Sequence, residues 1–126
     1  MRVADYITDF LFKHGIKTSF MLSGTGSVFL DDAFANFEGM NYVSARHESA
    51  AVMMAVGYYK LSQKPGVALV TTGPGGANAV GGVVEAWVDS VPVIIISGQA
   101  SSTQSTNKNL RQFGNKSVNI IDIVNR

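Results

Sequence analysis

The amino-acid sequence predicts an α/β protein with an open parallel sheet that helices cover on both faces. Short, continuous apolar runs alternate along the chain with longer segments whose apolar residues follow helical spacing. A strand that is apolar along its whole length is typical of a parallel sheet, because helices cover both faces of such a sheet. Glycine-rich turns stand between the runs and the helical segments, as tight strand-to-helix connections require.

The first half of the chain predicts two helices that alternate with two short strands. Apolar residues at helical spacing mark the helices, and a glycine stands just past the expected end of each. In order, the expected elements are a helix from Val3 that ends before Gly15, a strand over residues 18–22, a flexible turn over 23–27, a helix over 28–37 that Gly39 ends, and a strand over 42–44.

The second half predicts longer elements. The segment from Glu48 to Ser62 is rich in Ala and Met and has Gly57 as its one helix breaker, which favours a long helix. The next elements are a turn at residues 64–66, a strand over 67–71, a tight turn over 73–76, a helix over 77–88 and a strand over 91–97. Loop composition follows, and a new apolar segment begins at Ile120. We therefore expect residues 1–126 to form one domain that is a piece of a longer protein.

Composition excludes several classes of function. A net charge of +1 gives no indication of binding to nucleic acid or to an anionic membrane, and no apolar run approaches the ~20 residues that cross a bilayer. The absence of cysteine excludes disulfides, thiolate metal sites and a cysteine nucleophile. Asp5 and Asp9 interrupt the first segment, so it is not a signal peptide, and we expect a cytoplasmic protein. A chain that is 46% hydrophobic and 15% charged fits a globular domain that hides apolar surface against a partner.

Polar turns gather where ligands of open α/β sheets bind, beyond the carboxyl ends of the strands. Turns at residues 23–26, 72–76 and 97–99 follow strands, and residues 45–48 join a strand to the long helix. Glycine-rich turns before helices suggest phosphate binding, but the Gly-Lys-Ser/Thr of a P-loop is missing, and Asn78 replaces the third glycine of a dinucleotide fingerprint. A nucleotide-binding module is therefore disfavoured. The simpler interpretation, that these glycines only allow tight turns, stays open.

Glu48 is the strongest candidate for a catalytic residue. It begins the long helix, and residues 50–55 after it carry no charge. A carboxyl group held against apolar surface favours its neutral form, as a proton donor requires. The alternative is a first-turn glutamate that only interacts with the helix dipole, for less than about 1 kcal/mol.

Other candidate residues have simpler interpretations. Arg46 is expected to cap the end of a strand, while His47 is left open as a ligand, an acid–base group or a cap. Trp87, Met53 and Met54 are expected in the core or at an interface. Two histidines without a carboxylate cluster give no support for a metal site.

Six short motifs stand in order along the chain. They are Arg46-His47-Glu48, Gly57-Tyr58, Lys64-Pro65-Gly66, Gly73-Pro74-Gly75 with Asn78, Asp89-Ser90-Val91-Pro92 and Gly98-Gln99. In this order, and at nearly this spacing, they resemble the N-terminal third of the acetolactate synthase family, whose members use thiamine diphosphate (ThDP). The resemblance implies a ThDP pyrimidine-binding domain over residues 1–126, with a Rossmann-like, three-layer α/β fold.

The resemblance also implies roles for individual residues. Glu48 corresponds to the family's glutamate, which bonds N1′ of the ThDP aminopyrimidine and so helps to activate the cofactor. In that family the activated cofactor cleaves a 2-keto acid, and the remaining fragment passes to an acceptor carbonyl. The residues implied to bind the cofactor are Ser23, Gly24, Gly73, Pro74, Gly75 and Asn78.

Three departures accompany the resemblance. The family's Pro-Gly-Gly after the first strand is here Ser23-Gly24-Thr25. Its Phe-Gln-Glu falls on Asn115-Lys116-Ser117, which puts acetolactate production itself in question. The Gly-Asp-Gly…Asn segment that holds Mg²⁺ and the diphosphate does not occur in residues 1–126. We therefore expect Mg²⁺ and the diphosphate to be bound mainly by another domain, and the isolated domain to be inactive.

The sequence thus predicts the N-terminal domain of a ThDP-dependent lyase or carboligase that acts on a 2-keto acid, with FAD left open as a further cofactor. The implied partner is a second subunit, or the diphosphate-binding domain of the same enzyme, in a homodimer or tetramer. Two alternatives stay open, which are one subunit of a split ThDP-dependent 2-keto acid decarboxylase and a non-catalytic interaction domain of the same fold. The presence of Glu48 argues against the second, because a scaffold has no use for that acid.

Overall fold

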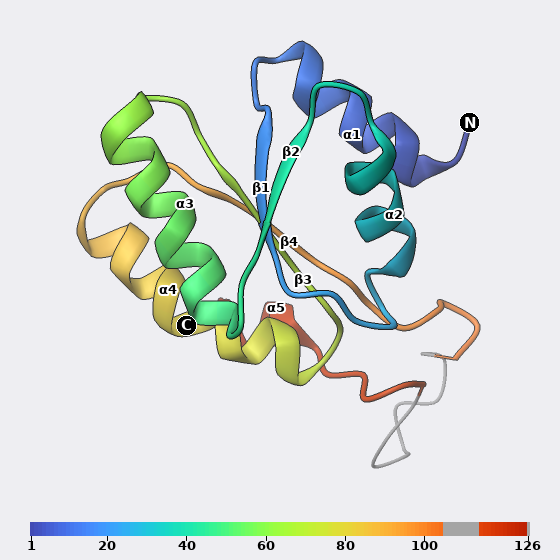
Figure 1. Ribbon diagram of the computed structural model, residues 1–126. Coiled ribbons are helices and arrows are strands. Elements are labelled where there is room, and N and C mark those ends of the chain that lie inside the picture. Colours follow the sequence, from blue (N-terminus) through green and yellow to red (C-terminus); the bar gives the residue numbers. More distant parts are fainter. Residues whose placement is uncertain (105–113, 126) are drawn as a thin grey trace.

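The computed structural model describes residues 1–104 and 114–125, in which helices alternate with strands (Figure 1). The helices are α1 (Val3–Lys13), α2 (Val28–Asn36), α3 (Glu48–Ser62), α4 (Pro74–Val88) and the short α5 (Ile120–Val124). The strands are β1 (Thr18–Met21), β2 (Asn41–Ser44), β3 (Val67–Val70) and β4 (Ile94–Ser97).

The strands of the described residues form one parallel sheet in the order β2-β1-β3-β4. Across it, Phe20 pairs with Val43 on one side and with Ala68 on the other, and Ala68 pairs with Ile95. β3 is buried along its whole length, whereas the edge strands β2 and β4 are exposed and half-buried respectively. The predicted parallel sheet is confirmed, and β3, which has a strand on each side and helices on both faces, has the continuous burial expected of it.

Helices cover the two faces of the sheet in pairs (Figure 1). α1 and α2 lie on one face, where Leu11 and Phe34 join Met21 in one buried cluster. α3 and α4 lie on the other, where Val52 and Val70 belong to a second cluster. The predicted three-layer arrangement is therefore confirmed. No helix in residues 1–104 and 114–125 is both long and apolar enough to span a membrane.

Several element boundaries differ from the sequence-based prediction by one residue and two differ by three residues, and proline explains the two larger differences. α4 begins at Pro74 rather than at residue 77, because the first position of a helix needs no N–H donor. β4 begins at Ile94 rather than at residue 91. The Val91 N–H still donates to the Ala86 carbonyl at the end of α4, at 2.9 Å, and Pro92 has no N–H to offer a neighbouring strand.

Three apolar residues that were expected in the core or at an interface lie at the surface. Trp87 is 85% exposed, Met53 45% and Met54 38%. The core half of that prediction is therefore wrong. All three stand on α3 or α4, the pair of helices that covers one face of the sheet.

Small residues let the backbones of α3 and α4 approach closely. A Cβ atom added at Gly82 would lie 2.5 Å from the Val52 Cβ and 2.9 Å from the Ser49 carbonyl oxygen. The Ser49 hydroxyl donates a short hydrogen bond to the Asn78 carbonyl, which joins the N-terminal parts of the two helices. Because Glu48 and Asn78 stand at these ends, the close approach decides how near their side chains lie to each other.

We predict that Gly82→Ala destabilises the fold by about 1–3 kcal/mol, because the added methyl overpacks the contact between the helices. Gly57→Ala is the matched control, since Gly57 lies in α3 and its added methyl would meet nothing within 4 Å. It should stabilise by about 0.5–1 kcal/mol through helix propensity. Urea denaturation of both variants measures the difference, and equal effects would contradict the close contact.

Candidate functional site

The candidate site lies at the edge of the sheet where β1 and β3 end and α3 and α4 begin. Because the strands are parallel, their carboxyl ends share this edge. We call residues 23–27, after β1, the first turn, and residues 73–76, at the start of α4, the glycine turn. Glu48, the first residue of α3, completes the set.

Glu48 is held with its carboxyl group largely away from water. The residue is 8% exposed, and its Oε2 atom accepts a hydrogen bond of 3.1 Å from the Asn78 side-chain amide. His47 is the N-cap of α3, because its Nδ1 atom accepts a hydrogen bond of 3.2 Å from the Ser49 N–H. His47 therefore caps the start of a helix and not the end of a strand, and both His47 and Arg46 are exposed.

The glycine turn leaves one flank of the Glu48 carboxyl without a covering side chain. A Cβ atom added at Gly75 would lie 3.5 Å from the Glu48 Oε1 and 2.8 Å from the Thr71 Cγ2. Gly73 has a φ of +60°, which few other residues adopt, and its Cα faces the Lys116 carbonyl closely. Pro74 is exposed at the first position of α4. Gly75 thus adds no side chain of its own beside the carboxyl, and the Thr71 methyl packs against it.

The first turn docks on Thr71, the residue that follows β3. The Gly26 N–H donates to the Thr71 hydroxyl at 3.0 Å. A Cβ atom at Gly24 would lie 2.5 Å from the Thr71 Cβ, so only glycine fits at this distance. Ser23 is exposed. Thr71 thus stands between Gly24 and Gly75, and it connects the two turns.

Asp31, in α2, holds the first turn from the other side. Its Oδ2 atom accepts hydrogen bonds from the Ser27 hydroxyl at 3.0 Å and from the Gly24 N–H at 3.4 Å. Its Oδ1 atom is buried and has no hydrogen-bond partner in the structure. Burial raises the pKa of the Asp31 carboxyl above its ordinary value, although the hydrogen bonds from Ser27 and Gly24 act in the opposite direction.

The segment from Asn115 to Val118 lies beside the glycine turn. The Thr72 hydroxyl donates to the Asn115 carbonyl at 3.3 Å. Gln99 holds the same segment, because its side chain donates to the Val118 carbonyl at 3.0 Å and accepts from the Ser117 hydroxyl at 2.9 Å. The residues that the sequence matched to the family's Phe-Gln-Glu thus reach this edge of the sheet.

The structure brings Glu48, Gly75 and Asn78 together. Gly24 lies on the other side of the Thr71 side chain, which separates it from Gly75. Sequence reasoning missed Thr71 and Asp31. The only signal for Asp31 was its position four residues after the end of the first turn. In residues 1–104 and 114–125 no three His, Asp or Glu side chains gather in a way that could hold a metal ion.

Comparison with known proteins identifies relatives of this chain. Residues 1–120 match the family described as "Thiamine pyrophosphate enzyme, N-terminal TPP binding domain". The acetolactate synthase large subunit of Lactococcus lactis is 46% identical over 85 residues, which are 68% of this chain and 15% of the relative. For the isozyme 3 large subunit of Escherichia coli the identity is 37% over 100 residues, 79% of this chain and 17% of the relative. For the chloroplastic acetolactate synthase of Arabidopsis thaliana it is 38% over 96 residues, 76% of this chain and 14% of the relative.

We predict that Asp31→Asn raises the melting temperature at neutral pH. The pKa of the Asp31 carboxyl is higher in the folded state than its unfolded value of 3.8, so ionising the carboxyl lowers the stability of the fold when the pH is above both values. This loss of stability disappears once the pH falls below 3.8, because the carboxyl is then protonated in both states. The advantage of the variant should therefore be present at pH 7 and shrink as the pH approaches 4, roughly the range in which an aspartate titrates.

Thermal melts over this pH range test the prediction. Asp32→Asn is the control, because Asp32 is an exposed neighbour whose carboxyl pairs with Arg2 at 2.7 Å. Its loss should bring no such gain at neutral pH. A gain of the same size in both variants would show that burial of Asp31 is not the cause.

Proposed function

We propose a function for this chain on the basis of its family: the chain belongs to the thiamine pyrophosphate enzymes, as an N-terminal TPP binding domain. The chain is, on this proposal, the pyrimidine-binding part of a ThDP-dependent lyase or carboligase that acts on a 2-keto acid. It spans 14–17% of the length of the three acetolactate synthases compared above, so the reaction belongs to a larger enzyme.

The observation that carries the proposal is the environment of Glu48. The residue is 8% exposed, its carboxyl accepts one hydrogen bond from Asn78, and its Oε1 atom lies beside Gly75, which has no side chain. A glutamate at the start of a helix that interacted only with the helix dipole would gain nothing from being shielded in this way, since burying a carboxyl costs free energy. The arrangement suits an acid that meets a ligand.

Each of these residues then has a definite task. Glu48 would hold a proton for N1′ of the aminopyrimidine, and Asn78, which donates to its Oε2 atom, would fix the orientation of its carboxyl. Gly73, Pro74 and Gly75, at the start of α4, would bind the ring together with Ser23 and Gly24 of the first turn. When bound, ThDP supplies the electron sink for breaking the bond next to the keto group.

Other parts of the enzyme complete the site. We propose that a diphosphate-binding domain, from the same chain or from a second subunit, holds Mg²⁺ and the diphosphate, since hard oxygen ligands for the ion do not gather in the described residues. The isolated domain is then inactive. A role for FAD and a cytoplasmic location stay predictions from the sequence.

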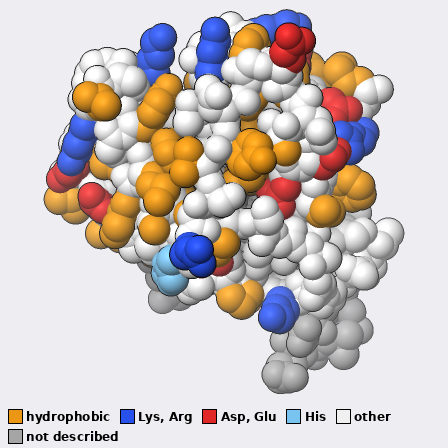
Figure 2. Space-filling model, viewed as in Figure 1, with side chains coloured by type: hydrophobic (Ala, Val, Ile, Leu, Met, Phe, Trp, Pro, Cys, Tyr) orange, Lys and Arg blue, Asp and Glu red, His pale blue; other side chains and the backbone are white. Residues whose placement is uncertain are grey.

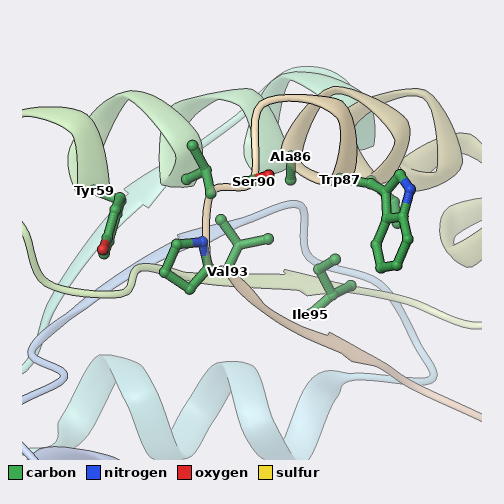
Figure 3. A pocket seen from close by; sticks show the side chains of 9 residues that line it. Tyr59, Ala86, Trp87, Ser90, Val93 and Ile95 are labelled. Carbon is green, nitrogen blue, oxygen red and sulfur yellow. The ribbon is translucent and has the colours of Figure 1, made fainter.

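The surface of α3 and α4 is where we place the partner subunit. Figure 2 shows hydrophobic side chains gathered over α3. On α4, Trp87 is 85% and Val88 73% exposed. Trp87 also borders a groove of about 900 Å³ (Figure 3). The groove is lined as well by Tyr59 of α3, Val93 and Ile95. Exposed apolar side chains gathered on one pair of helices are typical of an interface.

We predict that Glu48→Gln, in the complete enzyme, leaves the fold and ThDP binding largely intact and slows cofactor activation by roughly 10²–10⁴. The amide has nearly the same shape and can still bond to Asn78, but it cannot shift a proton toward N1′. The measurement is hydrogen–deuterium exchange at C2 of the ThDP thiazolium, with the melting temperature as the control for folding. Equal exchange rates would remove Glu48 from the mechanism and leave a non-catalytic interaction domain as the better interpretation.

We also predict that the chain associates with itself through α3 and α4. Trp87→Glu should weaken this association at least tenfold, or ~1.4 kcal/mol, since exposed tryptophans commonly carry much of an interface's binding energy. Val3→Glu is the matched control, because Val3 is 77% exposed but stands on α1, over the other face of the sheet. Sedimentation equilibrium measures both. A monodisperse monomer at high concentration would contradict the placement of the partner.

A further inference from the structure

We propose that Asp31 is a positioning residue, which fixes the first turn against Thr71 and thereby sets one wall of the site beside Glu48. The inference rests on the proposed function, because it concerns the site that would receive the pyrimidine ring. It assigns a role to an acid that lies outside every motif on which that function depends.

The first turn needs an external constraint. Its sequence, Ser-Gly-Thr-Gly-Ser, contains two glycines and no proline, so the turn has much conformational freedom of its own. Ser27, the last residue of the turn, is 1% exposed and precedes α2 without a side-chain cap on that helix. Its hydroxyl instead donates to the Asp31 carboxyl, so Asp31 anchors the turn from within α2.

Asp31 contacts the turn at two points that lie on either side of Gly26. The Ser27 hydroxyl donates to Oδ2 at 3.0 Å, and the Gly24 N–H to the same oxygen at 3.4 Å. Between these two points, the Gly26 N–H donates to the Thr71 hydroxyl at 3.0 Å. The turn is therefore held between an acid on one side and Thr71 on the other.

Contacts continue from the turn to Glu48. Gly24 lies against the Thr71 side chain, with 2.5 Å from an added Cβ to the Thr71 Cβ. The Thr71 methyl lies against Gly75, which adjoins the Glu48 Oε1. If the turn moved away, Thr71 would lose its neighbour on one side and the wall beside Gly75 would loosen. Asp31 thus acts on the site through Thr71, without touching the ring.

An acid in this position is costly unless it has a task. The Oδ1 atom is buried and has no hydrogen-bond partner in the structure, which is destabilising for a carboxyl oxygen. A residue that only filled space would be better replaced by an apolar one. An acceptor oxygen that takes two bonds from the first turn, as Oδ2 does here, gives the side chain that task.

The first test measures amide hydrogen exchange at Gly24 and Gly26 by NMR, in the 126-residue chain without cofactor. Asp31→Ala should speed up exchange at Gly26 tenfold or more, although the Gly26 N–H bonds to Thr71 and not to Asp31. Asp31→Asn keeps an acceptor oxygen and should restore slow exchange. Asp32→Ala is the control, since Asp32 is exposed and pairs with Arg2 instead. Unchanged exchange at Gly26 in Asp31→Ala would overturn the proposal.

The second test uses the complete enzyme. Asp31→Ala should raise the KM for ThDP tenfold or more and change kcat at saturating ThDP much less, while Asp31→Asn should recover the wild-type KM. An unchanged KM for ThDP, or an equal rise in Asp32→Ala, would overturn the proposal. If Asp31→Ala does not fold, Ser27→Ala removes one of the two contacts and should show the same two effects at a smaller size.

The two tests separate this inference from the proposed function. The amide measurement needs no cofactor, so it judges the positioning of the first turn alone. Unchanged C2 exchange in Glu48→Gln would overturn the proposed function and leave the effect at Gly26 in place.

Discussion

The close contact between α3 and α4 is the constraint on which the candidate site depends. Glu48 and Asn78 are 30 residues apart in the chain, and each stands near the beginning of its helix. Their side chains meet because Gly82 lets α4 lie almost on the backbone of Ser49. The contact that stabilises one face of the sheet therefore also determines the geometry of the acid and its amide partner.

Two shielded acids lie on opposite sides of Thr71, and their environments suit different tasks. Glu48 has an amide partner on one oxygen and a glycine without a side chain near the other, and we propose that it meets a ligand. Asp31 has one oxygen that accepts two bonds from the first turn and another that is closed off by the protein. An acid that faces a ligand and an acid that faces its own backbone can thus be distinguished by their contacts, although both are carboxylates next to a helix start.

Much of the fold could be predicted because the local signals agree with the global arrangement. The long helix α3 has the predicted ends, since a run rich in Ala and Met has few alternatives to a helix. The predicted starts of α4 and β4 were wrong by three residues, because Pro74 begins the helix while Pro92 precedes the strand. The effect of a proline thus depends on the element that follows it. Glu48 and the glycine turn were predicted through spacing and resemblance, and the structure places Glu48 beside Gly75. Thr71 and Asp31 were not, since the bond from Gly26 to Thr71 spans 45 residues and neither residue stands in a motif.

The contact of Gly73 with Lys116 has a consequence for the order in which the molecule is assembled. The glycine turn is backed by the segment after Gln99, and the bond from Thr72 to Asn115 closes a loop of 43 residues. The four strands of the described residues end at Ser97, so all of them are synthesised before that segment. The turn beside Glu48 can therefore receive its backing only after the residues of the whole sheet, and Lys116 itself, have been made.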